Sequence, residues 1–190
     1  MALFEDGVQL AGDWRKLGRG HAEQLVPMIA ALPGKGRADR IVVALGPGSF
    51  TGLRVGLAAA RALAFAWGAE LVGYPTLALV AAMARREGGG VTVAMTGGHG
   101  EWFVQDFAAD GSAATPLASR TPGDAAERAA SALVTGSQAE ALVALRGTGE
   151  ALALWPDARE FMLLPTSACT TEVHPLYGRA PDARLPVAAT

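Results

Sequence analysis

The chain has 190 residues, a formal net charge of −2, a hydrophobic fraction of 51% and a charged fraction of 18%. This composition excludes a disordered or fibrous chain, and the absence of a basic excess argues against a protein that grips nucleic acid by itself. The single cysteine, Cys169, excludes an internal disulfide and a multi-cysteine metal site.

The amino-terminal part predicts a hairpin followed by a helix. Residues 2–4 and 8–11 flank Asp6-Gly7, a dipeptide that is typical of tight hairpin turns. Apolar side chains recur at three- and four-residue spacing over 21–32, which predicts a helix that contains Pro27.

Residues 41–74 predict a strand, a tight loop, a helix and a second strand. The runs 41–45 and 71–74 are continuously apolar, as in buried parallel strands. A glycine-rich loop and an alanine-rich helix to Trp67 lie between them, with Gly68 as the expected C-cap. This order predicts a βαβ unit with a parallel strand pair.

The rest of the chain predicts further strands and helices. The expected elements are a helix over 76–86, a linker over 87–90, strands over 91–95, 102–107 and 133–136, and helices over 121–132 and 137–145. We therefore predict two α/β domains, an amino-terminal lobe over 1–87 and a smaller lobe over 88–190.

No targeting or membrane segment is expected. The first residues lack a basic region followed by a long apolar stretch, which argues against a signal peptide. Arg61, Glu70 and Pro75 interrupt the most apolar region, 56–84, so its pieces are too short to span a bilayer. A cytoplasmic protein without membrane contact is the expectation.

The glycine-rich loop is the most informative stretch of the sequence. It lacks the lysine of the phosphate loop, the glycine spacing of the dinucleotide fingerprint and the closing glycine of a nucleophile elbow. Ser49 and Thr51 are candidate N-caps for the helix that follows, and a tight turn without a ligand and an anion-binding helix start both fit the loop. The residues that would form the loop or contact a nucleotide are Gly46, Gly48, Ser49, Thr51, Gly52 and Arg54.

No catalytic residues and no metal site emerge from the remaining polar residues. The three histidines, His21, His99 and His174, are isolated, and no His-x-x-x-His pair occurs. The helix after the glycine-rich loop is apolar nearly all round. It is therefore buried on more than one side, either wholly within this chain or partly against a partner protein.

The run Gly46-Pro-Gly-Ser-Phe-Thr-Gly-Leu-Arg54 resembles a signature of the bacterial TsaB (YeaZ) family. His21-Ala-Glu-Gln-Leu-Val-Pro-Met-Ile, Tyr74-Pro-Thr-Leu77 and Leu176-Tyr-Gly-Arg179 extend the similarity. The resemblance implies an actin-like (ASKHA, ribonuclease H-like) fold with two α/β lobes. It also implies a pseudo-enzyme subunit without catalytic residues.

The resemblance further implies the partners of this chain. With a TsaD-like subunit and a TsaE-like ATPase, it would support transfer of threonylcarbamoyl to the tRNA adenosine next to the anticodon. It would meet tRNA only indirectly and have no cofactor of its own, with ATP or ADP at the partner interface. The helices matching 21–32 and 51–67 would pair with TsaD or with a second copy. The implied interface residues are His21, Leu25, Met28, Leu53 and Leu57.

This sequence departs from the family at its start. Family members normally begin with an apolar strand reading like Ile-Leu-Ala-Ile-Asp-Thr, whereas this sequence starts at the hairpin that follows. Because that strand is central in an actin-like sheet, its two neighbours would be left with unpaired N–H and C=O groups. Either the sequence is shortened, or another segment occupies the place.

Other classes of function stay open beside the scaffold subunit. One is a nucleotide-dependent enzyme of the actin-like superfamily or a glycoprotease-like hydrolase, which needs an acidic phosphate-binding loop or a metal pair that the sequence does not show. Another is a redox enzyme that uses the Gly-x-Gly loop.

Overall fold

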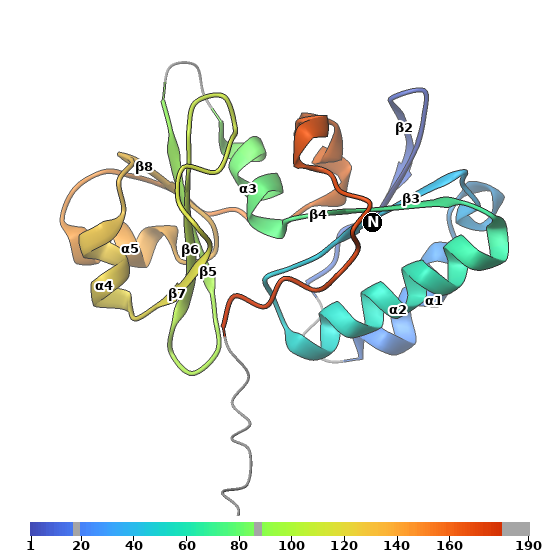
Figure 1. Cartoon of the computed structure of the whole chain (residues 1–190), viewed down its shortest axis with the longest axis horizontal. Helices are drawn as coiled ribbons and strands as arrows, with labels where there is room; N and C mark the ends of the chain where they lie inside the picture. Colours follow the sequence, from blue (N-terminus) through green and yellow to red (C-terminus); the bar gives the residue numbers. More distant parts are fainter. Residues whose placement is uncertain (17–19, 86–88, 180–190) are drawn as a thin grey trace, which may run out of the picture.

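The computed structural model describes residues 1–16, 20–85 and 89–179, which form two lobes (Figure 1). In the first lobe, β1 (Ala2–Glu5) and β2 (Val8–Gly12) form the predicted antiparallel hairpin. Asp6 and Gly7 both adopt positive φ, as a tight primed turn requires. No helix within these ranges is long and apolar enough to cross a membrane.

The βαβ prediction is confirmed. After α1 (His21–Ala30) and the 3₁₀ turn η1 (Pro33–Gly36), β3 (Arg40–Ala44) leads into α2 (Phe50–Trp67), and β4 (Glu70–Tyr74) follows. β3 and β4 are parallel, with Arg40 opposite Glu70. Gly68 ends α2 with a left-handed φ of 65°, which glycine adopts without strain.

The second lobe is a five-stranded sheet with helices on both faces. Its elements are α3 (Thr76–Ala84), β5 (Val91–Thr96), β6 (Trp102–Phe107), β7 (Ala118–Arg120), α4 (Pro122–Arg128), β8 (Leu133–Thr135), α5 (Ala139–Arg146) and β9 (Glu150–Leu152). The strand order is β7-β6-β5-β8-β9. α3 packs on one face of the sheet, and α4 and α5 pack on the other (Figure 1).

After β9 the chain returns to the first lobe through the 3₁₀ helices η2 (Ala158–Leu163) and η3 (Thr166–Ala168). The main-chain N–H of Leu176 donates to the carbonyl of Leu45 at 2.7 Å. The predicted boundary between residues 87 and 88 assigns this returning segment to the second lobe, although the segment bonds to the first lobe. Residues 86–88 lie outside the described residues. The two predicted lobes therefore share the carboxyl-terminal segment.

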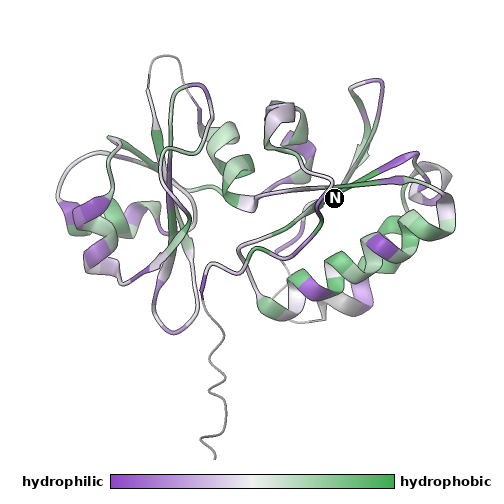
Figure 2. Ribbon diagram, viewed as in Figure 1, coloured by the Kyte–Doolittle hydropathy of each residue, from purple (hydrophilic) through white to green (hydrophobic). Residues whose placement is uncertain are grey.

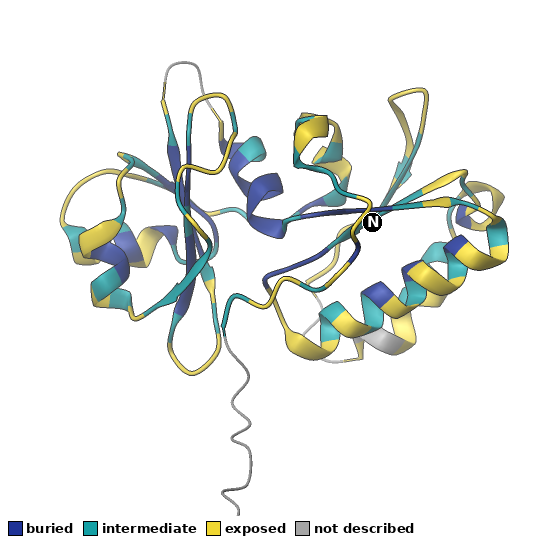
Figure 3. Ribbon diagram, viewed as in Figure 1, coloured by how far each residue is buried: buried dark blue, intermediate teal, exposed yellow. Residues whose placement is uncertain are grey.

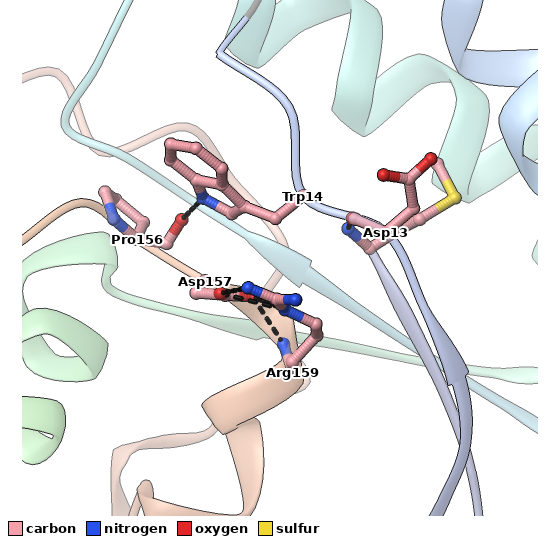
Figure 4. A network of polar contacts seen from close by, with 6 residues as sticks. Asp13, Trp14, Pro156, Asp157 and Arg159 are labelled. Atoms are coloured by element: carbon pink, nitrogen blue, oxygen red, sulfur yellow. Dashed lines mark hydrogen bonds and ion pairs between the residues drawn. The ribbon is translucent and has the colours of Figure 1, made fainter.

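A polar network fastens the hairpin to this returning segment (Figure 4). The indole Nε1 of Trp14 donates to the carbonyl of Pro156 at 2.9 Å. The Asp157 carboxylate, on a buried residue, accepts from the Arg159 guanidinium at 2.6 Å and from the Arg159 main-chain N–H at 2.9 Å. Arg159 thus holds the start of η2 in place, and Trp14 links this start to the residues after the hairpin.

We expect the Asp157–Arg159 pair to contribute stability that is lost in acid. The hydrogen bonds from Arg159 lower the pKa of Asp157 below its ordinary value of 3.8. A carboxyl group whose pKa is lower in the folded state stabilises the fold above its unfolded pKa, and this stabilisation disappears as the pH falls through the folded pKa. Urea unfolding from pH 6 to pH 2.5 should show a smaller acid-side loss for Asp157→Asn than for the unchanged chain. An equal loss would contradict this assignment.

Candidate functional site

The glycine-rich loop is packed into the protein at its first two residues. Gly46 and Pro47 are buried, and the Gly46 carbonyl accepts from the Thr76 N–H at 2.8 Å. Gly46 has a φ of +106°, and a Cβ atom there would lie 2.7 Å from the Leu176 carbonyl oxygen. Both its backbone conformation and its neighbours therefore require glycine.

The second half of the loop begins α2. The Ser49 hydroxyl accepts from the Gly52 N–H at 3.4 Å, which confirms the predicted N-cap. Gly48, Ser49 and Thr51 are exposed, and Gly52 is half-buried. The loop is thus a strand-to-helix turn with an exposed tip.

Arg54 belongs to an exposed aromatic cluster beside this tip. Its guanidinium lies 3.6 Å from the centroid of the Phe50 ring, and its Nε donates to the Tyr177 hydroxyl at 3.2 Å. The Phe50 and Tyr177 rings are 5.2 Å apart. Arg54 is therefore held by side chains of its own molecule and covers the start of α2.

Leu57 is a core residue, which corrects its prediction as an interface residue. It is 3% exposed and packs with Leu45 and Val173. Ala60 and Ala64, which lie on the same side of the helix, are also buried. This side of α2 is filled by β3 and by the returning segment, so Leu57 has little surface left to offer a partner.

The opposite side of α2 is exposed and apolar (Figures 2 and 3). The exposed α2 stripe consists of Ala58, Ala62, Phe65 and Ala66. These positions are four, seven and eight residues apart from the first, so they share one helix face. Phe65 is 92% exposed, an extreme value for a side chain of this size.

α1 lies beside α2 and adds further apolar surface (Figure 1). Val26 on α1 is 63% exposed. The predicted residues Leu25, Met28 and Leu53 are half-buried, and their role at an interface stays a prediction. His21 begins α1, and its side chain lies outside the described residues.

The sequence did not predict Phe65 and the exposed α2 stripe as a candidate contact surface, because helix periodicity alone does not show which face is buried. The apolar residues of α2 surround the helix, and a stripe through Leu57 looks as suitable for a partner as a stripe through Phe65. The sequence feature that points to Phe65 is the presence of three alanines on the same helix face. Their small side chains leave the phenylalanine ring protruding from an otherwise flat surface.

In the described ranges no group of three or more His, Cys, Asp or Glu side chains is placed to hold a metal ion. The site as a whole thus consists of a closed glycine-rich turn, an aromatic cluster at the start of α2 and an apolar helix face. Its exposed parts are the aromatic cluster and the apolar helix face.

Comparison with known proteins agrees with this fold. The family model for TsaD, tRNA N6-adenosine threonylcarbamoyltransferase, matches residues 15–156. YeaZ from Pseudomonas aeruginosa has 25% sequence identity and a TM-score of 0.74, over 93% of this chain and 92% of that chain. The chain belongs to the TsaB (YeaZ) branch of this family.

A second solved structure leads to the same TsaB assignment. It is described as an uncharacterized protein with similarity to peptidase YeaZ from Pseudomonas aeruginosa, with 26% identity and a TM-score of 0.76 over 94% of this chain and 93% of that chain. The actin-like α/β fold is therefore confirmed. At the level of the TsaB family, the role is in threonylcarbamoyladenosine modification of tRNA.

Proposed function

We propose that this TsaB-family chain is a non-catalytic subunit that binds a TsaD-like partner through α1 and α2. In this way it would support threonylcarbamoyl transfer to the tRNA adenosine next to the anticodon. The observation that carries the proposal is the exposed α2 stripe, in which Phe65 is 92% exposed. A ring of this kind, standing in water on a rigid helix, is typical of an interface anchor.

The small residues around Phe65 favour a helix as the surface that meets it. Ala58, Ala62 and Ala66 let a second helix approach α2 closely, and the Phe65 ring then fills the space between the two helices. Full burial of a phenylalanine side chain is worth about 1.5–3 kcal/mol. An apolar helix pair on the partner, or the same pair in a second copy, supplies such a surface.

Charge also bears on the choice of partner. α2 contains no acidic residue, and its charged residues are Arg54 and Arg61. The Arg61 guanidinium donates to the Val173 carbonyl at 2.6 Å, so its positive charge lies along one side of α2. Acidic side chains on a partner helix would complement this charge and fix the register between the two helices.

Binding of nucleotide and of tRNA would depend on the partners of this chain. The glycine-rich turn is closed by packing at Gly46 and has no lysine, so we propose no intrinsic cofactor. ATP or ADP would bind where this chain meets its TsaD-like and TsaE-like partners. With a net charge of −2, the chain would contact tRNA only through them.

The test is co-purification of the tagged chain with the TsaD-like protein of the same organism, followed by tRNA analysis after depletion. We expect a stable complex and a loss of threonylcarbamoyladenosine from tRNA. The isolated chain should show no change in thermal midpoint with ATP and Mg²⁺. No complex together with unchanged tRNA would refute the proposal, and a large ATP-dependent shift would favour an enzyme.

A further inference from the structure

The guanidinium of Arg54 is held in one orientation at the exposed start of α2. Its Cζ lies over the Phe50 ring, 3.6 Å from the ring centroid, so the ring covers one face of the planar group. Its Nε donates to the hydroxyl of Tyr177, which comes from the returning carboxyl-terminal segment. A free arginine side chain loses rotamer entropy when it binds, and these two contacts restrict the Arg54 side chain before a partner arrives.

The remaining donors of this cluster are unused. Among the residues that the structure describes, the two terminal nitrogens of Arg54 have no hydrogen-bond partner, and no carboxylate forms an ion pair with them. By contrast, Arg40 is paired with Glu70 at 2.6 Å. α2 contains no acidic residue, so its own helix supplies no carboxylate for Arg54. The Tyr177 oxygen accepts the Nε hydrogen, which leaves the phenolic O–H to donate elsewhere.

The geometry of these donors fits a carboxylate. Because Nε is already bonded, a ligand meets the guanidinium end-on, where its two terminal nitrogens match the two oxygens of one planar carboxylate. A phosphate dianion carries more charge than one guanidinium balances, and both lysines of the chain, Lys16 and Lys35, lie outside α2. A single carboxylate therefore suits this arginine better than a nucleotide phosphate does.

Arg54 lies in line with the exposed α2 stripe. Positions 50, 54, 58, 62 and 66 are four residues apart, and Phe50, Arg54, Ala58, Ala62 and Ala66 are all exposed. Rows of this spacing form the ridges along which helices pack. At a rise of 1.5 Å per residue, Arg54 lies about 6 Å along the axis from Ala58. A helix that covers the alanines therefore passes within reach of the Arg54 guanidinium.

We infer that Arg54 binds a carboxylate side chain of the TsaD-like partner, with Phe50 and Tyr177 as positioning residues. The inference rests on the proposed function and adds the chemistry of one contact within that surface. The partner carboxylate accepts from both terminal nitrogens of Arg54, at the amino-terminal end of the ridge. A partner helix in another register would cover Arg54 without pairing it, and an unpaired buried charge disfavours that arrangement. Arg54 thus fixes the register of the two helices.

The experiment measures the affinity of the purified TsaD-like protein for the full chain and its variants by isothermal titration. Arg54→Gln should weaken binding by about thirtyfold or more, because the partner carboxylate is left without its cation. Arg54→Lys should weaken it by about tenfold, because lysine keeps the charge but not the planar fork. Since the Arg54 side chain is exposed, both variants should keep the thermal midpoint of the unchanged chain.

Tyr177→Phe tests the positioning role of the hydroxyl. It keeps the ring, which lies 5.2 Å from the Phe50 ring, and removes only the acceptor for the Arg54 Nε. Affinity should fall by about threefold, as for the loss of one hydrogen bond. In an Arg54→Lys background the same change should cause no further loss, because lysine has no Nε–H to orient. A purely structural role of Tyr177 would add to the effect of Arg54→Lys.

The matched control is Arg128→Gln. It removes one positive charge from an exposed helix position on α4 of the second lobe, where Arg128 pairs with Asp124 of its own chain. Affinity for the partner should be unchanged. A loss equal to that of Arg54→Gln would assign the effect to net charge and contradict the inference.

Three further results would overturn the inference. The first is equal affinity of Arg54→Gln, Arg54→Lys and the unchanged chain; if Phe65→Glu still weakens binding, the proposed function stands and only the carboxylate contact is wrong. The second is binding of inorganic phosphate to the isolated chain that Arg54→Gln abolishes, because Arg54 would then hold phosphate. The third is the lack of any complex with the unchanged chain, which contradicts the proposed function as well.

Discussion

Phe65→Glu should weaken binding to a TsaD-like partner by about a hundredfold or more while the chain stays folded. The substitution removes an apolar anchor and places a charge in a surface that excludes water on binding, a change that typically costs several kcal/mol. The fold should tolerate it because Phe65 is 92% exposed in the isolated chain. Isothermal titration of the purified pair measures the effect.

The matched control for Phe65→Glu is Leu145→Glu. Leu145 is also an exposed apolar side chain on a helix, at 58% exposure, but it lies on α5 in the second lobe. It should leave affinity for the partner unchanged. Equal weakening by both variants, or none by Phe65→Glu, would show that the exposed α2 stripe is not the contact surface.

Leu57→Glu cannot serve as an interface test. Leu57 is 3% exposed among Leu45 and Val173, so the substitution buries an unpaired carboxylate. The variant should unfold, and any loss of binding would report that unfolding. Phe65 lies two turns further along the same helix, and its exposed ring contributes little to the free energy of folding. Phe65→Glu therefore tests the contact with the partner without unfolding the chain.

Gly46→Ala should destabilise the chain by about 3 kcal/mol or more. Alanine is strained at a φ of +106°, and its Cβ would lie 2.7 Å from the Leu176 carbonyl oxygen and 2.8 Å from Leu53 Cδ1. The loop would have to shift, and with it the main-chain bond between Leu176 and Leu45. Equilibrium urea unfolding gives the change in free energy.

Gly56→Ala is the control for the glycine-rich region. Gly56 lies within α2, and a Cβ there would meet no atom within 4 Å. Because alanine restricts the unfolded chain and favours helix, this variant should gain about 0.5–1 kcal/mol. If Gly46→Ala were as stable as Gly56→Ala, the loop would not need glycine at its first position.

Local features of this chain followed from the sequence because they depend on neighbours a few residues away. Asp6-Gly7 predicted the hairpin, Ser49 and Gly68 predicted the ends of α2, and the apolar runs predicted β3 and β4 as a parallel pair. The loop from Gly46 to Arg54 predicted the family, which the comparisons confirm. Strands β7 and β9 were not predicted, because each has 3 residues and, unlike β8, contains no β-branched residue.

What the sequence determined by itself is thus the set of main elements, the βαβ order and the family. Only the tertiary structure decided which side of α2 is inside, because Leu57 is covered by Val173, a residue more than a hundred positions away. It also decided that η2 lies over both small sheets, because the Phe161 ring lies against Phe4 of β1 and Tyr74 of β4. The physical reason is that burial and edge pairing depend on contacts between distant segments, which local spacing does not encode.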